Sequence, residues 1–236
     1  MQAVREWLKE AKSVAVLTGA GVSAESGIPT FRGAQGLWKQ FRAEELATPE
    51  AFARDPKLVW EWYDWRRSVI AQAQPNAGHR ALAETEARVP QFTLITQNVD
   101  DLHERAGSRN VLHVHGSIWT VRCVGCGFEQ VDQRVPLTEI PPRHSCGGLL
   151  RPGVVWFGES LPQHVWAAAE RAASESDLFL VIGTSAIVYP AAGLARIAKS
   201  HGARIVEINV AETPLASFSD EFLQGASGEV LPRLIA

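Results

Sequence analysis

Two histidines, separated by a single residue, are the side chains of this chain best suited to acid–base chemistry. In "VLHVHGS", His113 and His115 alternate with Val114, so a strand would place both imidazoles on one face. A neutral imidazole can take up a proton near neutral pH. His115 is favoured as the general base because it precedes Gly116, where a strand would leave the sheet. Structural histidines or a pair of metal ligands are the alternatives.

A glycine-rich segment indicates a second kind of chemistry, the binding of phosphate groups. "GAGVSAESG" follows an apolar run and fits the pattern GxGxxA through Gly19, Gly21 and Ala24. Glycines let the backbone approach a pyrophosphate, and the next helix offers N–H donors. A plain turn between a strand and a helix is the alternative. About 20 positions further on, "GLWKQFRAEEL" reads as a helix and lacks the acidic strand end of simple hydride-transferring dehydrogenases.

Two further polar segments would stand close to such a loop. "GIPTFRG" carries Arg32, which could hold a phosphate or carboxylate through two hydrogen bonds or could simply face solvent. "TQNVDDLHERAG" follows an apolar run, and its Gln97, Asn98 and Asp100 stand where doubly wound sheets contact their ligands. Capping of the next helix by Asn98 or Asp100 is the alternative.

The three cysteines form an incomplete metal-binding pattern. Cys123 and Cys126 make the CxxC half of a zinc knuckle, and Cys146 stands in "RHSCGG". A tetrahedral structural zinc needs four ligands, and His144 is the candidate for the fourth. The spacing between His144 and Cys146 is unusual for a zinc knuckle. The alternative is that this region binds no metal and is held together by packing.

The segment "WEWYDWRR" places Tyr63 and Arg66 three residues apart, on one face of a predicted helix. Arg66 can bind a carboxylate through two hydrogen bonds, and the Tyr63 hydroxyl can donate another. The alternative is an ion pair between Arg66 and Glu61 or Asp64, with Tyr63 in the core. We expect Arg67 and the three tryptophans to be surface and packing residues.

The pattern of strands and helices predicts the scaffold that positions these groups. Apolar, β-branched runs occur at "SVAVLTGAG", "FTLIT" (92–96), "DLFLVIGTS" (177–185) and "RIVEIN" (204–209), and helical patterns separate them. The alternation predicts an α/β fold with a parallel sheet, helices on both faces and ligands beyond the carboxyl ends of the strands. Residues 36 to 75 and 116 to 157 break the alternation and are predicted to be insertions that form a small second domain.

Composition narrows the partners and the compartment. The chain has 236 residues, of which 46% are hydrophobic and 21% charged, with a net charge of −3. These values are typical of a globular protein. They do not indicate the excess of basic residues expected for binding to nucleic acid or to an anionic membrane. The N-terminus lacks a signal-peptide pattern and the few cysteines suit a reducing compartment, so we expect a cytoplasmic protein without nucleic-acid or membrane partners.

Taken together, seven motifs resemble the sirtuins, the NAD-dependent protein lysine deacylases. They are "GAGVSAESGIPTFRG", "TQNVDDLHERAG", "HVHGSIW", "CVGC", "LLRPGVVWFGE", "VIGTSAIVYPAA" and "VEIN", and they follow in the family's order from about residue 11 to 230. The resemblance implies a Rossmann-like large domain made of 1–35, 76–115 and 158–236. The small domain would comprise a helical module (36–75) and a cysteine-containing ribbon (116–157), with NAD between the two domains.

The resemblance also implies roles for individual residues. The phosphate loop would be Gly19, Ala20, Gly21 and Ser23, and the adjoining cofactor-binding loop would include Glu25, Pro29, Thr30, Phe31 and Arg32. Gln97, Asn98 and Asp100 would surround the nicotinamide and its ribose, and the other half of NAD would meet Gly183, Thr184, Ser185, Asn209 and Ser227. His115, Asn98 and Asp100 would form the catalytic group, with His115 as base on the ribose hydroxyls.

The implied substrate is an acyl-lysine protein or peptide that adds as a strand along "VVWFGE", with Val155 and Phe157 beside the acyl-lysine tunnel. Thr30 in "PTFRG", the small Ala47 and the Tyr63–Arg66 pair resemble the branch of the family that removes acidic acyl groups. We therefore expect preference for succinyl and malonyl groups, with glutaryl as a further candidate, and weaker deacetylation. The implied products are nicotinamide, lysine and O-acyl-ADP-ribose.

Other functions and departures from the family stay open. The same NAD site would also suit a mono-ADP-ribosyltransferase, or a non-catalytic module that senses NAD, although the intact His115, Asn98 and Asp100 argue against lost chemistry. Where the family usually has its fourth zinc cysteine, this chain has Arg143. The ribbon would then hold a structural zinc through its cysteines and His144, or none. We expect a monomer.

Overall fold

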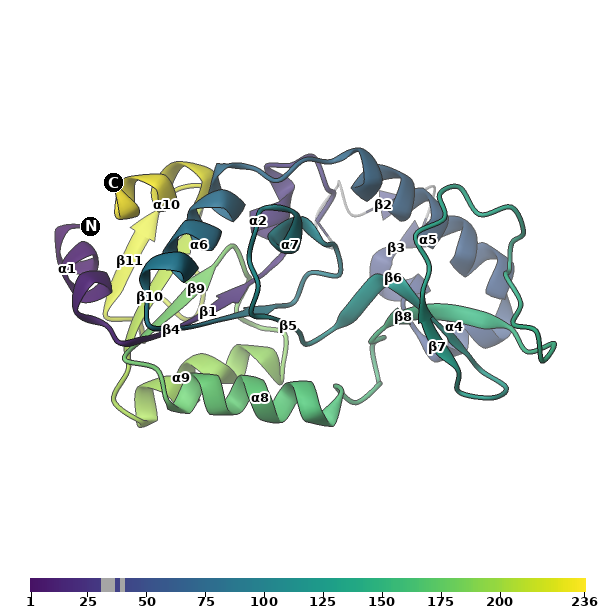
Figure 1. Cartoon of the computed structure of the whole chain (residues 1–236). Helices are drawn as coiled ribbons and strands as arrows, with labels where there is room; N and C mark the ends of the chain where they lie inside the picture. Colours follow the sequence, from purple (N-terminus) through teal and green to yellow (C-terminus); the bar gives the residue numbers. More distant parts are fainter. Residues whose placement is uncertain (31–36, 39–40) are drawn as a thin grey trace.

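A six-stranded parallel sheet, with the helices that cover it, forms the larger lobe of the molecule (Figure 1). The computed structural model describes residues 1–30, 37–38 and 41–236. The order across the sheet is β11 (Glu221–Gln224), β10 (Arg204–Asn209), β9 (Leu178–Ile182), β1 (Ser13–Thr18), β4 (Gln91–Thr96) and β5 (Val111–His113). The chain runs outward from β1 in both directions, so the strand order reverses between β1 and β9, where such sheets bind ligands. The predicted α/β fold is confirmed.

The apolar runs became strands because helices cover both faces of this sheet. Along β1, Val14 and Val16 enter one apolar cluster with α6 (Ala77–Arg88) and α10 (Ser227–Ile235). Ala15 and Leu17 point to the opposite face, towards α8 (Gln163–Ser174) and α9 (Leu194–Ser200). Figure 1 shows these two helix pairs on opposite sides of the sheet. The shorter elements around it are α1 (Gln2–Glu10), α2 (Ala20–Ala24), α7 (Leu102–Arg105) and η2 (Ala191–Gly193).

The two regions that break the alternation lie together as a smaller lobe beside the sheet (Figure 1). β7 (Glu129–Val131), β6 (Gly116–Cys123) and β8 (Leu150–Val154) form an antiparallel sheet in that order. It shares an apolar core with α4 (Pro49–Arg54) and α5 (Pro56–Gln72). α3 (Ala43–Leu46) and the short pair β2 (Leu37–Trp38) and β3 (Phe41–Arg42) precede them. The residue boundaries given above for the two domains remain a prediction.

Local signals fix where the two main helices of the small lobe begin. The Thr48 hydroxyl accepts a hydrogen bond from the Ala51 N–H (3.0 Å), and the Asp55 carboxylate accepts one from the Leu58 N–H (2.9 Å). A proline follows each cap, at a position where no backbone donor is needed. These caps set the register of α5, which decides which of its side chains face the core.

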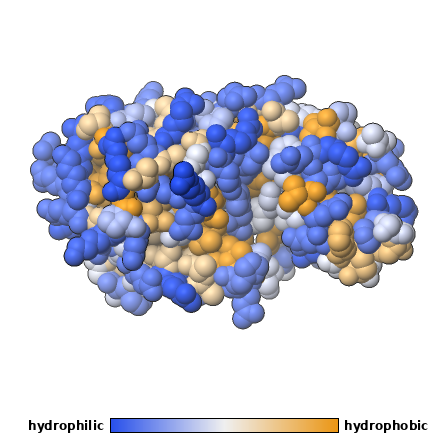
Figure 2. Space-filling model, in the orientation of Figure 1, coloured by the Kyte–Doolittle hydropathy of each residue, from blue (hydrophilic) through white to orange (hydrophobic). Residues whose placement is uncertain are grey.

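The surface is mainly hydrophilic on the face shown in Figure 2, with smaller hydrophobic areas among the polar residues. The large apolar side chains that stay exposed include Phe157 (46%), Ile187 (48%) and Tyr189 (66%), close to the cavity described below. Within the part of the chain that the structure describes, no helix is long and apolar enough to cross a membrane.

The expectation that Arg67 lies at the surface was wrong. Its side chain is fully buried, and its Nε–H donates to the backbone carbonyl of Ile118 on β6 (2.9 Å). The guanidinium lies over the rings of Trp60 (5.3 Å) and Trp119 (5.7 Å). Aromatic faces and a carbonyl replace part of the water that a buried cation loses. Arg67 therefore ties the helical part of the small lobe to its ribbon.

Replacing Arg67 with alanine should destabilise the protein by roughly 3 kcal/mol, because it leaves a cavity and an unpaired buried carbonyl. Urea unfolding followed by tryptophan fluorescence would measure the loss. The control is Arg171→Ala at an exposed position of α8, which should change stability by no more than about 0.5 kcal/mol. Equal effects of the two substitutions would contradict the structural role of Arg67.

Candidate active site

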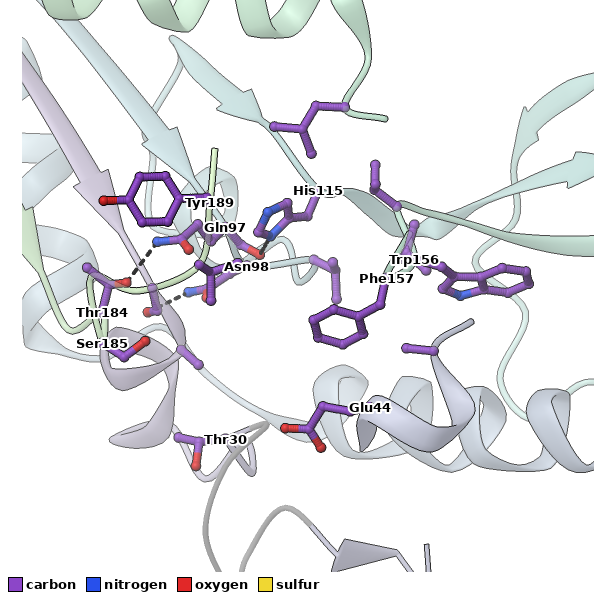
Figure 3. A pocket seen from close by; sticks show the side chains of 18 of the residues that line it. Thr30, Glu44, Gln97, Asn98, His115, Trp156, Phe157, Thr184, Ser185 and Tyr189 are labelled. Atoms are coloured by element: carbon purple, nitrogen blue, oxygen red, sulfur yellow. Dashed lines mark hydrogen bonds between the residues drawn. The ribbon is translucent and has the colours of Figure 1, made fainter. Parts of the chain in front are cut away.

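A cavity of about 440 Å³ opens between the carboxyl ends of the central strands and the small lobe (Figure 3). Most of the residues predicted to bind cofactor or substrate line it. They are Gly19, Ala20, Gly21, Thr30, Ala47, Tyr63, Gln97, Asn98, His115, Val155, Phe157, Gly183, Thr184, Ser185 and Asn209. Residues from segments far apart in sequence therefore line one cavity, at the place where parallel sheets bind their ligands.

The glycine loop is in close backbone contact with the end of β9. The Gly21 N–H donates to the Gly183 carbonyl at 2.8 Å, and a Cβ on Gly21 would lie 2.7 Å from that oxygen. Gly183 itself has φ +59°, a conformation that favours glycine. Any side chain at Gly21 would thus force the two loops apart. This contact leaves bare backbone on the cavity wall, which suits the close approach of a phosphate group.

Asn98 is held in the cavity wall by a buried hydrogen-bond network. Its side-chain amide donates to the Gly19 carbonyl and to the Ser23 hydroxyl, both at 3.1 Å. Ser23 in turn donates to the Asp100 carboxylate (2.9 Å), whose other oxygen accepts from the Leu102 N–H (3.1 Å). Burial raises the pKa of Asp100, against these hydrogen bonds. The N-cap position of α7 is Asp101, so neither Asn98 nor Asp100 is the capping residue, although Asp100 accepts from the first N–H of that helix. Through Ser23, Asp100 also orients Asn98 from behind.

Hydrogen bonding fixes the tautomer of His115. Its Nδ1 lies 3.1 Å from the backbone carbonyl of Gln97. A carbonyl can only accept, so Nδ1 carries the hydrogen and Nε2 keeps its lone pair. Burial lowers the pKa of His115, which keeps the ring neutral. His115 is therefore built as a proton acceptor on the cavity wall.

His113 has a different environment although it lies only two residues away. Its Nε2 pairs with the Glu104 carboxylate (2.5 Å), and its Nδ1 lies 3.3 Å from the Asn98 carbonyl. It does not line the cavity among the residues that the structure describes. Both ring nitrogens of His113 are thus used within the protein, which leaves His115 as the histidine able to act on a bound molecule.

Polar side chains at or just beyond the carboxyl ends of β4, β9 and β10 hold the other end of the cavity together. The Gln97 amide donates to the Thr184 hydroxyl (2.9 Å), and the Asn209 amide donates to the Thr184 carbonyl (2.8 Å). Figure 3 shows Gln97 pointing to Thr184, with Ser185 beside it. These groups line the cavity and offer donors and acceptors at the height of the glycine loop, where a nucleotide would need them.

Several predicted cofactor residues lie away from the cavity lining. Ser23 and Asp100 stand behind Asn98, as described above. The Ser227 hydroxyl and the Gly228 N–H donate to the Glu25 carboxylate at 2.6 and 3.0 Å, so Glu25 joins α2 to the start of α10. Pro29 lines a separate small hollow beside α5. Phe31 and Arg32 lie outside the described residues.

The predicted substrate residues occupy the wall formed by the small lobe. The Val155 N–H donates to the His115 carbonyl (2.8 Å), and the Phe157 N–H donates to the Ala47 carbonyl (2.9 Å). His115 lies in the turn between β5 and β6, not on a strand with His113 as the sequence pattern suggested. The segment after β8 thus ties this turn to the helical module. Strand β8 ends at Val154, so Val155 and Phe157 follow it as irregular chain whose N–H groups are already paired. A peptide adding here would use other backbone groups of this segment.

Tyr63 and Arg66 are both buried, but only Tyr63 lines the cavity. The Trp156 indole N–H donates to the Tyr63 hydroxyl oxygen (2.9 Å), and burial raises the pKa of Tyr63. The phenol therefore keeps its own hydrogen to donate. Arg66 lies behind Tyr63 in the small hollow with Pro29, with its guanidinium 5.4 Å from the Trp62 ring.

The acids proposed as alternative partners of Arg66 have other contacts. Glu61 approaches Lys57 at 3.8 Å, and Asp64 accepts a hydrogen bond from the Leu137 N–H at 2.9 Å. Burial lowers the pKa of Arg66, while the neighbouring Tyr63 and Asp100 side chains oppose that shift. Because an arginine side chain keeps its proton in proteins, a positive charge stands beside Tyr63, one layer behind the cavity wall.

Some cavity residues had no role in the sequence interpretation. Val99, Trp156, Leu161, Val188, Tyr189, Pro190 and Glu44 also line it. Trp156, Val188, Tyr189 and Pro190 belong to motifs quoted above, and their place in those motifs could have indicated a cavity position. Nothing in the sequence around Glu44 indicated one. Figure 3 shows its carboxylate projecting from α3 towards the space below Phe157.

The ribbon brings together four groups that fit a structural zinc. Cys126 Sγ lies 3.4 Å from His144 Nδ1 and 3.6 Å from Cys146 Sγ, and Cys123 Sγ lies 3.5 Å from Cys146 Sγ. All four donor atoms lie within 4.8 Å of one another. Tetrahedral zinc with Zn–S of about 2.3 Å separates its ligands by roughly 3.3 to 3.8 Å. His144 Nδ1 thus lies where a fourth zinc ligand would stand, despite its unusual spacing from Cys146.

The fold and the cavity define an α/β protein that binds a nucleotide at the switch point of a parallel sheet and carries a zinc-type ribbon beside it. A sequence model described as "Sir2 family" matches residues 19–190. The chain belongs to the Sir2 family, and the predicted resemblance is confirmed.

Individual relatives match nearly the whole chain. An "NAD-dependent protein deacylase 2" of Pyrobaculum aerophilum is 58% identical over 233 residues, which cover 98% of this chain and 93% of the relative. An "NAD-dependent protein deacylase" of Aquifex aeolicus is 59% identical and covers 88% of this chain and 87% of the relative. The crystal structure of a Sir2 homologue in complex with NAD superimposes with a TM-score of 0.94 at 52% identity, covering 100% of this chain and 92% of that one.

The tautomer and burial of His115 predict the acid side of the pH profile. Because burial lowers its pKa, the neutral base should persist below the ordinary value of about 6.5 and be lost only as pH falls further. We expect kcat/KM for deacylation to be flat around neutrality, with its acidic midpoint below pH 6.5. Circular dichroism at each pH would exclude unfolding. A midpoint above pH 6.5 in folded protein would contradict this environment.

Zinc analysis of ribbon variants tests the fourth ligand. We expect one zinc per chain in the wild type, and loss of zinc with a lower Tm in His144→Ala, since three thiolates leave a tetrahedral site open. His144→Cys supplies another good ligand and should retain the metal. Full zinc content in His144→Ala, or no zinc in wild-type protein refolded with zinc, would show that His144 is not a ligand.

Proposed function

We propose that this protein is an NAD-dependent protein-lysine deacylase that prefers acidic acyl groups such as succinyl and malonyl. Membership of the Sir2 family and the relatives' names support NAD-dependent deacylation of proteins. The acyl preference is the finer part of the proposal. It rests on one observation, the Tyr63 hydroxyl on the cavity wall with its hydrogen free to donate.

The cavity residues suggest how the chain supports deacylation. NAD, when bound, supplies the ribosyl group that accepts the acyl group. The glycine loop would hold its phosphates, and Gln97 and Asn98 would orient the nicotinamide end. His115 Nε2 would take up a proton from a hydroxyl group within hydrogen-bonding distance, since Nδ1 is committed to Gln97. The apolar side chains of Val155 and Phe157 would keep water away from the reacting groups.

Tyr63 would bind the terminal carboxylate of the acyl chain. Its oxygen already accepts from the Trp156 indole, so its hydrogen is directed elsewhere. The raised pKa keeps the phenol protonated at neutral pH. A hydrogen bond to a charged group contributes about 1.5–3 kcal/mol. Such an interaction is absent with an acetyl group, which ends in a methyl.

Arg66 would favour the same carboxylate through its charge. It is only 6% exposed next to Tyr63, and charges interact more strongly in such surroundings than in water. Ala47 adds room, because its small side chain on the cavity wall does not fill the space that a longer acyl chain needs. Glu44 on another part of the wall would repel a carboxylate, so the acid is expected on the Tyr63 side.

Kinetics on matched peptides test the preference. Tyr63→Phe removes only the hydroxyl, and we expect kcat/KM for a succinyl-lysine peptide to fall about tenfold or more, with at most about a twofold change for the acetyl-lysine peptide. Arg66→Met should act in the same direction. Mass spectrometry of the products, with acetyl, malonyl, succinyl and glutaryl peptides, would identify the reaction and the preference together.

Glu44→Gln is a control that should change kcat/KM for the succinyl peptide in the opposite direction. Removing a negative charge from the cavity wall should raise kcat/KM for the succinyl peptide and leave the acetyl peptide nearly unchanged. Equal losses on both peptides in Tyr63→Phe and Arg66→Met would refute the acidic preference while leaving deacylation intact. Transfer of ADP-ribose to protein without O-acyl-ADP-ribose would instead indicate a transferase.

A further inference from the structure

Two histidines are buried behind the cavity, in a place that the proposed reaction does not use. His79, on α6, is 0% exposed and His103, on α7, is 1% exposed, and their ring centroids are 4.8 Å apart. Burial lowers the pKa of His79 to about 4 and that of His103 well below its usual range. Neither lines the cavity. Burying two imidazoles is costly unless their polar atoms have partners.

The hydrogen-bond partners define the tautomer of each ring. The Asn76 N–H donates to His79 Nδ1 (3.3 Å), so the hydrogen of His79 is on Nε2. Thr18 donates its hydroxyl hydrogen to Thr96 Oγ1 (2.9 Å), so its oxygen accepts from His103 Nε2, 3.0 Å away. His103 Nδ1 then carries a lone pair. The remaining nitrogens, the donor His79 Nε2 and the acceptor His103 Nδ1, are buried without a hydrogen-bond partner in the described part of the chain.

A continuous chain of hydrogen bonds leads from His103 to the cavity. After Thr18 and Thr96, the next link is the Asn98 N–H, which donates to Thr96 Oγ1 (3.0 Å). Thr18 and Thr96 are the last residues of β1 and β4 and are fully buried. Asn98 is the first member of this series of hydrogen bonds that lines the cavity. It lies next to Gln97, whose carbonyl orients His115.

We propose that His103 is a positioning residue, whose Nε2–H orients the Thr18 and Thr96 hydroxyls so that Thr96 holds the backbone of Asn98 in the cavity wall. The proposal rests on the proposed function, because it assigns Asn98 a place beside the bound NAD. Without the donor of His103, the Thr18 hydroxyl loses its fixed direction. The Thr96 oxygen can then turn away from Asn98, and the peptide that carries the Gln97 carbonyl moves with it.

A matched pair of variants separates the hydrogen bond from packing. His103→Gln keeps an N–H close to the position of Nε2, whereas His103→Phe keeps the ring volume without the donor. We expect His103→Phe to lose about tenfold in kcat/KM for NAD, with the KM for the acyl peptide nearly unchanged. His103→Gln should recover most of that loss. Calorimetric titration with NAD alone should show the same order of affinities without any turnover.

Thr18 supplies a second pair in case His103→Phe fails to fold. Thr18→Val removes the hydroxyl at constant shape, and Thr18→Ser retains it. Only Thr18→Val should reproduce the loss in NAD affinity. The double variant His103→Phe with Thr18→Val should be no worse than either single one, because both interrupt the same chain.

The outcomes distinguish the two proposals. If the wild-type protein binds NAD but deacylates no peptide, the proposed function is refuted. The NAD titrations would still test the hydrogen-bond series from His103 to Asn98. Additive losses, equal losses in His103→Phe and His103→Gln, or unchanged NAD affinity in Thr18→Val would overturn the role of His103 in an active enzyme.

Discussion

The close contact between the loops after β1 and β9 is the constraint on which the rest of the site depends. Gly21 and Gly183 touch through their backbones because neither carries a side chain, and the contact leaves bare backbone on the cavity wall. Because β1 and β9 are neighbours at the point where strand order reverses, this backbone also faces the small lobe. A cavity between the two lobes follows from the connectivity of the sheet.

The polar groups around the cavity are held by other protein groups before any ligand enters. Asn98 is fixed by Gly19 and Ser23, and His115 by the Gln97 carbonyl. The segment after β8 joins both lobes through the His115 and Ala47 carbonyls. Such preorganisation means that little reordering is needed when substrates bind, and buried neighbours strengthen each hydrogen bond. It also explains why residues behind the wall, such as Asp100, matter to its shape.

Much of the fold and the site could be predicted from local patterns. The apolar runs identified the buried strands, because a strand covered on both faces has few places where a polar side chain could reach water. The glycines, Gln97 and Asn98 after β4, and His115 identified parts of the cavity wall. Arg67 was mispredicted because its sequence neighbours do not reveal the two tryptophan faces and the β6 carbonyl that surround it. Glu44 carried no signal for the same reason.

The sequence by itself determined the elements, the family and the set of groups able to do chemistry, since these depend on residue type and on spacing along the chain. Only the tertiary structure decided which groups meet. It gave His115 and His113 different environments, since His115 contacts the Gln97 carbonyl and His113 the Glu104 carboxylate. It also placed Tyr63 on the cavity wall with Arg66 behind it. It also brought His144 to three cysteines. Such contacts arise between distant segments, and hydrogen-bond direction and burial exist only once those segments pack.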